Sequence, residues 1–459
     1  MMEFAQLIQG GMGIGISGWR LAGAVAGCGQ MGVISGLCLD EMLARKLQIG
    51  DPGGYVRKAL ENFPIRKIAK NVLDRFFNEK GKGKDVPFIP VAAVSTDEER
   101  NDLLVAGSFA EMYLAKQGHS GVVWVNLLQK CQSDTIPTLY GCMLAGADFV
   151  TMGAGIPREI PGVLDRLSDN DEAEIRLTVA GSTSADDYRI SFDPKRYEVS
   201  KLKRPSFLAI ISSNVLALTL AKKSNGEVNG FIIEGATAGG HNAPPRGGCA
   251  LSEKGEPIYG EKDTVDLAKI KEIGLPFWLA GGYSIKGKLK EAMALGAQGI
   301  QAGTAFLLCE ESGLVHRLKE LLIKIKCDVF TNPFASPTGF PFKEVKLDGT
   351  LSEPEVYSKR PRMCNLGYLR ERFRNPDGSL GFRCAAESIK AFIAKGGSAD
   401  LANKSKCLCN ALFANIGLGN VYSNGYSEAP LITAGDILPH LDFVFQGITA
   451  REVVDILLA

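Results

Sequence analysis

The stretch FWLAGGYSIKGKLKEAMALGAQGIQAGT, residues 277–304, decides the fold class. A short apolar run ends in Gly281-Gly282, a helix-type segment follows over 286–295, and a second apolar run at 299–301 leads into Gly303-Thr304. Strand, helix and strand in this order are typical of a right-handed βαβ unit with parallel strands. The stretch therefore predicts an α/β fold with glycine-rich loops at the strand ends.

Six more β-type runs precede this stretch and repeat its pattern. They are short, apolar and bounded by glycine, and they cover residues 5–9, 32–35, 122–127, 148–152, 207–212 and 230–234. Helix-type segments such as 19–27 and 136–145 lie between them. Eight such units predict a (β/α)8 TIM barrel, which takes about 250 residues. An open doubly wound sheet is the alternative.

The remaining residues are expected to form two insertions and an appended region. We predict a barrel over 1–326, with a mostly helical insertion near 40–84 and a second insertion near 158–204. In the second insertion, the runs 175–180 and 188–192 could pair as a hairpin. Beyond Cys327 the chain becomes rich in Pro and Gly, so 327–459 is predicted as a C-terminal extension. The spacing of Thr449 and Glu452 is that of a capping box, which predicts a last helix through Leu458.

Composition and charge favour a globular protein with a small-molecule partner. The 459 residues are 45% hydrophobic and 22% charged, and 52 Lys+Arg against 51 Asp+Glu give a net charge of +1. Such a balance provides no general attraction to nucleic acid or anionic membranes. The longest apolar stretch, 207–221, is too short to span a bilayer, and no basic residue precedes Arg20. We therefore expect a cytoplasmic protein; its oligomeric state, including a homo-oligomer, stays open.

The 11 cysteines are expected to be reduced thiols, because scattered cysteines in a reducing compartment are usually buried small apolar residues. Four of them, Cys364, Cys384, Cys407 and Cys409, fall in the C-terminal extension. A metal or iron–sulfur site is the alternative for these four. Their spacing is not that of a CxxC pair, so the sequence predicts no metal site.

Glycine is abundant: it makes up 53 of the 459 residues, whereas a typical protein has ~7% glycine. The glycine clusters mark the predicted strand ends. In a barrel these ends open on one face. Gly281-Gly282 and Gly303-Thr304 follow adjacent strands there, where bare backbone N–H groups and a hydroxyl can hold a phosphate group. A tight turn is the alternative explanation of Gly281-Gly282. The apolar, glycine-lined surroundings favour a flat cofactor that carries the phosphate.

Three other features are expected on the same face. Gly10-Gly11-Met12 offers backbone N–H groups without side-chain obstruction, and Asn126 offers a donor and an acceptor to a heterocycle, with a buried core amide as its alternative. His241 follows a strand end behind two glycines, so it is the candidate base or substrate contact. The histidines elsewhere, His119, His316 and His440, are expected to be structural.

Taken together, these motifs resemble the nitronate monooxygenase family, formerly called 2-nitropropane dioxygenases. The resemblance runs from about Phe4 to Lys326 and rests on QGGMG (9–13), VNL (125–127), AGGH (238–241), LAGG (279–282) and QAGT (301–304). It implies non-covalently bound FMN, with the phosphate at Gly281, Gly282, Gly303 and Thr304. The ring and ribityl chain would be surrounded by Gly11, Met12, Asn126, Ser213, Gly240 and Gln301. His241 matches the family's active-site histidine.

The resemblance leaves the reaction open, because flavin enoyl reductases of fatty-acid, polyunsaturated-lipid and polyketide synthesis share this barrel and its histidine. Our leading hypothesis is oxidation of alkyl nitronates with O2 to carbonyl compounds and nitrite. The alternatives are an NAD(P)H-dependent enoyl-thioester reductase, to which Arg246 would add a phosphate contact, and a non-catalytic flavin-binding subunit that docks through its tail.

Overall fold

Eight parallel strands form the barrel that the sequence predicts. The computed structural model describes residues 5–91, 96–248 and 250–459. The first four residues of the predicted barrel, which include Phe4, and Cys249 lie outside the described residues. The strands follow the order β1-β10-β9-β8-β7-β4-β3-β2, and every neighbouring pair is parallel. They are β1 (Leu7–Gln9), β2 (Gly32–Ser35), β3 (Val123–Leu128), β4 (Phe149–Gly153), β7 (Ser206–Ile211), β8 (Gly230–Glu234), β9 (Phe277–Ala280) and β10 (Gly299–Ala302).

A short bridge closes the barrel between its first two strands. Ile8 of β1 forms a parallel bridge with Met31, just before β2. The Met31 N–H donates to Leu7 O at 3.0 Å, and the Gln9 N–H donates to Met31 O at 2.9 Å. The ring of strands is therefore nearly complete, and the alternative of an open doubly wound sheet is wrong.

Side chains from successive strands fill the barrel interior. One buried cluster takes side chains from β1, β2, β3, β4, β7, β8 and β9, among them Ile8, Val33, Trp124, Phe149, Leu208, Ile232 and Trp278. The neighbouring residues of these strands point outward and join the larger core under the helices. This alternation is the period of two that strands impose, and it makes the barrel a packed core with its loops free to carry a site.

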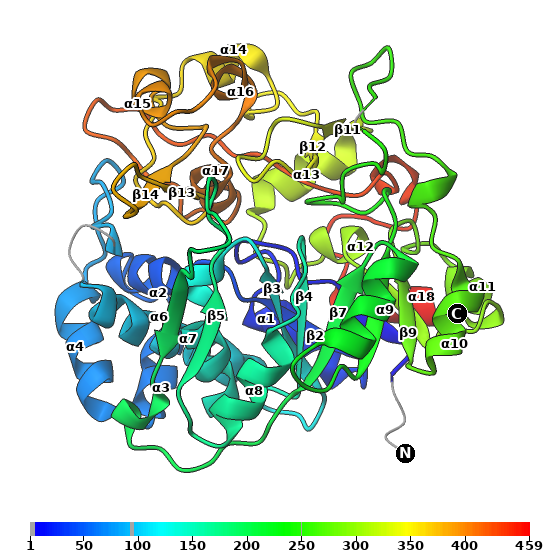
Figure 1. Cartoon of the computed structure of the whole chain (residues 1–459), viewed down its shortest axis with the longest axis horizontal. Helices are drawn as coiled ribbons and strands as arrows, with labels where there is room; N and C mark the ends of the chain where they lie inside the picture. Colours follow the sequence, from blue (N-terminus) through cyan, green and yellow to red (C-terminus); the bar gives the residue numbers. More distant parts are fainter. Residues whose placement is uncertain (1–4, 92–95, 249) are drawn as a thin grey trace.

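Helices surround the strands (Figure 1). The helices that follow or precede barrel strands are α1 (Trp19–Gly27), α6 (Asp97–Ala115), α7 (Gln132–Leu144), α8 (Ile160–Ser168), α9 (Asn214–Lys223), α10 (Leu267–Ile273), α11 (Lys288–Ala294), α12 (Thr304–Leu307) and α13 (His316–Lys324). The first insertion contributes α2 (Leu39–Gln48), α3 (Tyr55–Glu61) and α4 (Arg66–Phe76). The second contains the antiparallel hairpin of β5 (Ala173–Arg176) and β6 (Arg189–Phe192), with η1 (Pro194–Tyr197) after it.

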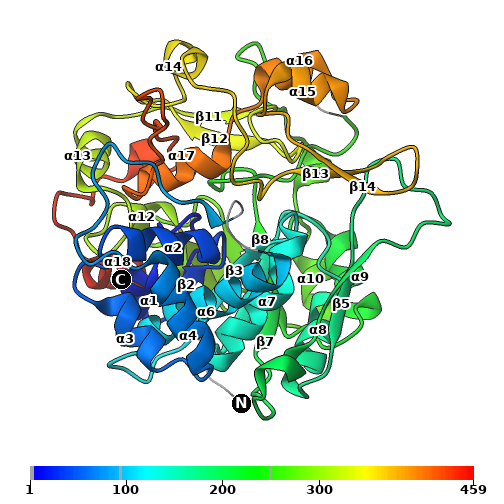
Figure 2. The same cartoon turned by 90° about the vertical axis from the view of Figure 1, so that its left-hand side faces the viewer.

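The residues between 329 and 430 gather above one end of the barrel, away from the N-terminus (Figures 1 and 2). This region contains two small antiparallel hairpins and four short helices. They are β11 (Val329–Asn332), β12 (Phe342–Val345), α14 (Pro354–Ser358), β13 (Glu371–Arg374), β14 (Leu380–Arg383), α15 (Ile389–Ala394), α16 (Ala399–Lys404) and α17 (Leu408–Asn415).

The end of the chain returns to the barrel. After η3 (Leu438–His440), helix α18 (Ala450–Leu458) packs against α1, α11, α12 and β1, and its Val453, Val454 and Leu457 are buried in the main core. Its start is the predicted capping box: Thr449 Oγ1 accepts the Glu452 N–H, and Glu452 Oε2 accepts the Thr449 N–H. The division at residue 326 stays a prediction.

Candidate active site

Most of the predicted cofactor contacts line one cavity at the carboxyl ends of the barrel strands. This cavity has a volume of about 150 Å³, and the loops after β1, β8, β9 and β10 form much of its wall. Nine of the ten residues are on its wall: Gly11, Met12, Asn126, Gly240, Gly281, Gly282, Gln301, Gly303 and Thr304. Segments almost 300 residues apart thus meet at the place where a barrel commonly carries its site. We call this space the cradle.

The loop after β9 gives the cradle a bare backbone. Gly281 and Gly282 have φ angles of +83° and +76°, in the left-handed region that favours glycine. A Cβ built on Gly281 would lie 3.0 Å from Thr237 Oγ1 and 3.1 Å from the Ala238 N. The chain therefore excludes side chains at this position, and the exposed peptide groups fit an anionic oxygen group such as a phosphate.

The loop after β1 fits a flat ring. A Cβ on Gly11 would lie 2.4 Å from the Cβ of Asn126, so only glycine lets the two segments come this close. Asn126 Nδ2 donates to Gly11 O at 3.1 Å, whereas Asn126 Oδ1 is buried without a hydrogen-bond partner. A buried acceptor of this kind needs a donor. A heterocycle with an N–H group in the cradle would supply one.

One wall of the cradle comes from residues that sequence reasoning missed. Thr433, Ala434, Gly435 and Ile437 line it, and we call residues 433–437 the C-terminal strap. The Gly435 N–H donates to Thr304 Oγ1 at 2.9 Å, and Thr433 Oγ1 accepts the Gly240 N–H at 2.7 Å. Neither a motif nor a periodic pattern marks the strap, because its role depends on contacts with residues far away in the chain.

A second, larger cavity adjoins the cradle. It has a volume of about 540 Å³ and shares Ile210 and Glu234 with the cradle. Its wall is mainly apolar, with Ile156, Val215 and Phe340 among the lining residues. We call it the outer cavity. An apolar space with a few convergent polar groups is the usual form of a substrate pocket.

His241 and Ser213 lie on the outer cavity rather than in the cradle. Ser213 Oγ accepts the Leu216 N–H at 3.1 Å, so this side chain caps the start of α9. The structure thus brings His241 beside the cradle, because its neighbour Gly240 lines the cradle, whereas Ser213 lines the outer cavity and not the cradle. The predicted contact between Ser213 and the cofactor stays a prediction.

The His241 ring is fixed by residues from the C-terminal extension. Its Nε2 lies 2.7 Å from the Oγ of buried Ser336, and Phe342 packs edge-on against it with ring centroids 4.9 Å apart. The backbone of His241 also forms an antiparallel bridge with Phe342. Burial lowers the pKa of His241 to about 4, so the ring is neutral near pH 7. A neutral imidazole offers a hydrogen bond rather than a positive charge.

Two ionisable groups on the outer cavity complete the site. Glu234 ends β8 and reaches both cavities, and burial raises its pKa to about 8. Arg246 is oriented by three contacts: its backbone N–H donates to Asp263 Oδ1 at 2.8 Å, and its guanidinium donates to Ser212 O at 2.6 Å and to Lys262 O. A positioned guanidinium on this wall can meet an anionic group of a ligand.

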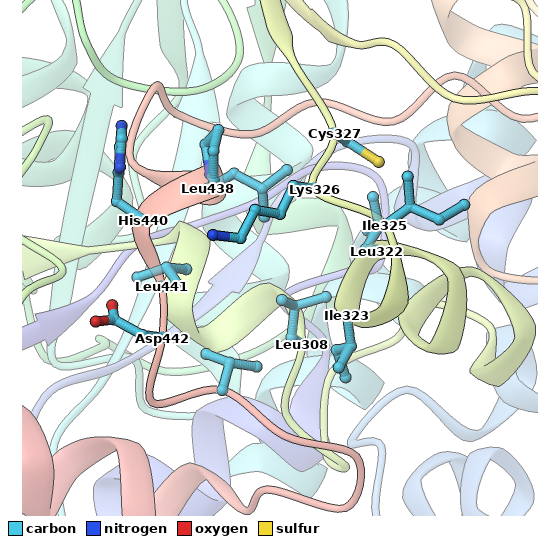
Figure 3. Close-up of a pocket in the computed structure, with 12 residues that line it drawn as sticks. Leu308, Leu322, Ile323, Ile325, Lys326, Cys327, Leu438, His440, Leu441 and Asp442 are labelled. Atoms are coloured by element: carbon cyan, nitrogen blue, oxygen red, sulfur yellow. The ribbon is translucent and has the colours of Figure 1, made fainter.

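A further cavity of about 430 Å³ lies outside the barrel mouth (Figure 3). It opens between the end of α13 and the residues after the strap, and Leu322, Ile325 and Leu441 are among its lining residues. None of the predicted site residues lines it. The predicted structural histidine His440 lies at its edge.

Four cysteines of the extension converge on each other. Cys364, Cys384, Cys407 and Cys409 surround one small space. Within the described ranges, no group of three or more His, Cys, Asp or Glu side chains is arranged to hold a metal ion. In the same ranges, no helix is both long and apolar enough to cross a bilayer.

The comparison with known families finds the resemblance that the motifs predict. Residues 172–337 match the model of the family described as nitronate monooxygenase. The probable nitronate monooxygenase of Bacillus subtilis is 33% identical over 134 residues, which are 28% of this chain and 37% of that protein. The corresponding protein of Staphylococcus saprophyticus is 32% identical over 135 residues, 29% of this chain and 36% of that protein. The matched segments thus span little more than a third of these curated relatives.

The solved structures support the fold. FabK from Thermotoga maritima superposes with a TM-score of 0.50 at 15% sequence identity, and the superposition covers 99% of this chain and 91% of that chain. At this identity the likeness shows the barrel fold alone. The resemblance predicted from the motifs is confirmed over residues 172–337, which are similar to the nitronate monooxygenase family.

Proposed function

We propose that this chain is an FMN-dependent oxidoreductase that converts alkyl nitronates with O2 to carbonyl compounds and nitrite. The observation that carries the proposal is the gathering of nine predicted cofactor contacts around one cradle beside His241. The family match over 172–337 supports the same reaction class. A cytoplasmic location and a small-molecule substrate belong to this proposal.

The cradle residues would hold FMN at both of its ends. The backbone of Gly281 and Gly282, with Gly303 and the Thr304 hydroxyl, would bind the phosphate. Asn126 would meet the ring system, because its buried Oδ1 lacks a donor. Bound FMN would supply the electron-accepting chemistry that none of the protein side chains can provide.

His241 would bind the nitronate rather than generate it. An imidazole whose pKa is lowered to about 4 is a weak base toward a neutral nitroalkane, but its N–H still donates a hydrogen bond. A nitronate is already deprotonated and needs no base. Arg246, on the same cavity, would add an attractive positive charge.

The test is the visible spectrum of the purified chain, followed without oxygen. We expect a bound flavin that a nitronate such as propyl-2-nitronate reduces and that NADH or NADPH leaves oxidised. With oxygen, nitrite should form. His241→Ala should retain the flavin and lose nitronate turnover, and full turnover in this variant would show that His241 has another role.

The size of the outer cavity favours a second candidate, the NAD(P)H-dependent enoyl-thioester reductase. A small nitronate fills little of about 540 Å³, whereas an acyl chain would cover the apolar wall that includes Ile156, Val215 and Phe340. Arg246 would then meet a phosphate of the thioester carrier or the nucleotide.

The same anaerobic experiment separates the two candidates. Rapid bleaching of the flavin by NADPH or NADH, followed by reoxidation with an enoyl thioester such as crotonyl-CoA, would replace the nitronate reaction with the reductase. Turnover of either substrate by the isolated chain would exclude a non-catalytic flavin-binding subunit. A chain that neither contains nor rebinds a flavin would contradict both enzymes.

A further inference from the structure

Glu234 stands at the junction of the two cavities without a partner for its charge. It is the last residue of β8, and its side chain lines both the cradle and the outer cavity. The described residues give its carboxyl neither a hydrogen bond nor an ion pair, and burial is the one cause of its raised pKa. Glu234 is partly buried between the two cavities, so ligands that fill both of them would take away the hydration of an ionised carboxylate without compensation.

The surrounding groups do not compensate the charge. Among the residues that line the cradle, Glu234 is the sole ionisable one. The outer cavity adds His241, Arg246, Tyr259 and Asp263. His241 is neutral near pH 7, Asp263 accepts the backbone N–H groups of Gly260 and Arg246, and the Arg246 guanidinium is bound to the carbonyls of Ser212 and Lys262.

We propose that Glu234 works as a neutral carboxylic acid whose O–H donates a hydrogen bond to an oxygen atom of the ligand bound at the junction of the two cavities. The inference rests on the proposed function, since it places the reacting ligand there. It gives the outer cavity a second donor beside His241, and it selects ligands that present an acceptor oxygen, above all an oxyanion.

This arrangement makes ligand binding depend on pH in a defined direction. With a pKa of about 8, the carboxyl is protonated at pH 7 and ionised at pH 9. Ionisation removes the donor and puts a negative charge against an anionic ligand. The donor fraction falls about tenfold between these two pH values, so the affinity for an oxyanion should fall by at least the same factor.

The first experiment needs neither ligand nor turnover. Infrared spectra of the purified protein at pH 7 and pH 9 should show the C=O stretch of a protonated carboxylic acid that disappears with a midpoint near pH 8. Glu234→Gln should lack this band, and Glu61→Gln, which changes an exposed residue at the end of α3, should keep it. Asp134, whose pKa is about 6, is mostly ionised at pH 7 and contributes little.

The second experiment measures binding of an unreactive oxyanion, inorganic nitrite, through its effect on the flavin spectrum. The wild-type affinity should fall about tenfold or more from pH 7 to pH 9, whereas Glu234→Gln, whose amide stays a donor, should bind equally at both pH values. Equal pH dependence in the two proteins would overturn the inference.

The infrared result distinguishes this inference from the proposed function. If the protein binds no flavin, the function fails, but the protonated carboxyl is still tested. If wild-type protein shows no protonated carboxyl at pH 7, the inference fails, whether or not Glu234→Gln folds and whether or not nitronates are oxidised.

Discussion

Gly281 is the residue on which the shape of the cradle depends most directly. Its φ of +83° and the 3.0 Å between a Cβ and Thr237 Oγ1 leave no space for a side chain. We expect Gly281→Ala to cost about 1 kcal/mol of unfolding free energy and to weaken flavin binding by about tenfold or more. Flavin titration of the apoprotein measures the second effect.

Gly274→Ala is the matched control for this substitution. Gly274 ends α10 with a φ of +81°, and a Cβ there would meet no atom within 4 Å. It therefore carries the same backbone penalty without filling the cradle. Equal flavin affinity in the two variants would contradict the role of Gly281 in binding.

Ser336 is expected to act through His241 as a positioning residue. Its Oγ is the one hydrogen-bond partner of the His241 ring among the described residues, and removing it leaves Nε2 unpaired. Ser336→Ala should lower kcat for nitronate oxidation about tenfold, with flavin content unchanged. The NMR signals of the His241 ring should shift as well, whereas Ser358→Ala on α14 should move neither quantity. An unchanged ring signal in Ser336→Ala would refute the contact.

At the scale of elements, the strands could be predicted almost to the residue. The predicted strands 32–35, 230–234 and 277–280 have those bounds in the structure, because glycine or the end of an apolar run marks both their ends. Helix bounds were less accurate: α7 begins at Gln132, ahead of the predicted 136, since its first turn is polar and adds nothing to the apolar pattern.

The capping box of α18 gives a prediction for one helix. Thr449→Ala removes the side chain that accepts the Glu452 N–H, so the unfolding free energy should fall by about 1 kcal/mol. Amide hydrogen exchange should accelerate in α18 first. Thr449→Ser keeps the capping hydroxyl and should behave like wild type, and equal exchange in Ala and Ser variants would show that the cap is not stabilising.

At the scale of the molecule, the sequence predicts the barrel and most of the cradle but not what closes over them. The glycine motifs are local, so the loops after β1, β9 and β10 could be assigned to one face. The contacts of His241 with Ser336 and Phe342, and of Thr304 with Gly435, join segments 95 to 131 residues apart, and no local pattern encodes them.

The buried ionisable groups predict how stability varies with pH. The folded-state pKa of Glu234 is raised to about 8, above its unfolded value, so the native state binds more protons and stability falls as pH rises toward 8. His241, with its pKa lowered to about 4, acts oppositely, but only below about pH 6.5. From pH 6.5 to 8 the Glu234 contribution should therefore reduce the unfolding free energy by about 1–2 kcal/mol.

Urea unfolding at several pH values measures this contribution as a difference between proteins. Glu234→Gln should lose less stability than wild type between pH 6.5 and 8, because its amide does not ionise. Parallel curves for the two proteins would mean that Glu234 is not buried as a neutral acid.

The C-terminal strap has a consequence for biosynthesis. Gly435 donates to Thr304 from 131 residues further along the chain, so a ribosome that has released all eight barrel strands has not yet released one wall of the cradle. A nascent chain halted at that stage should be unable to retain its prosthetic group, and flavin fluorescence on stalled ribosomes would register the moment at which residue 437 emerges from the ribosome.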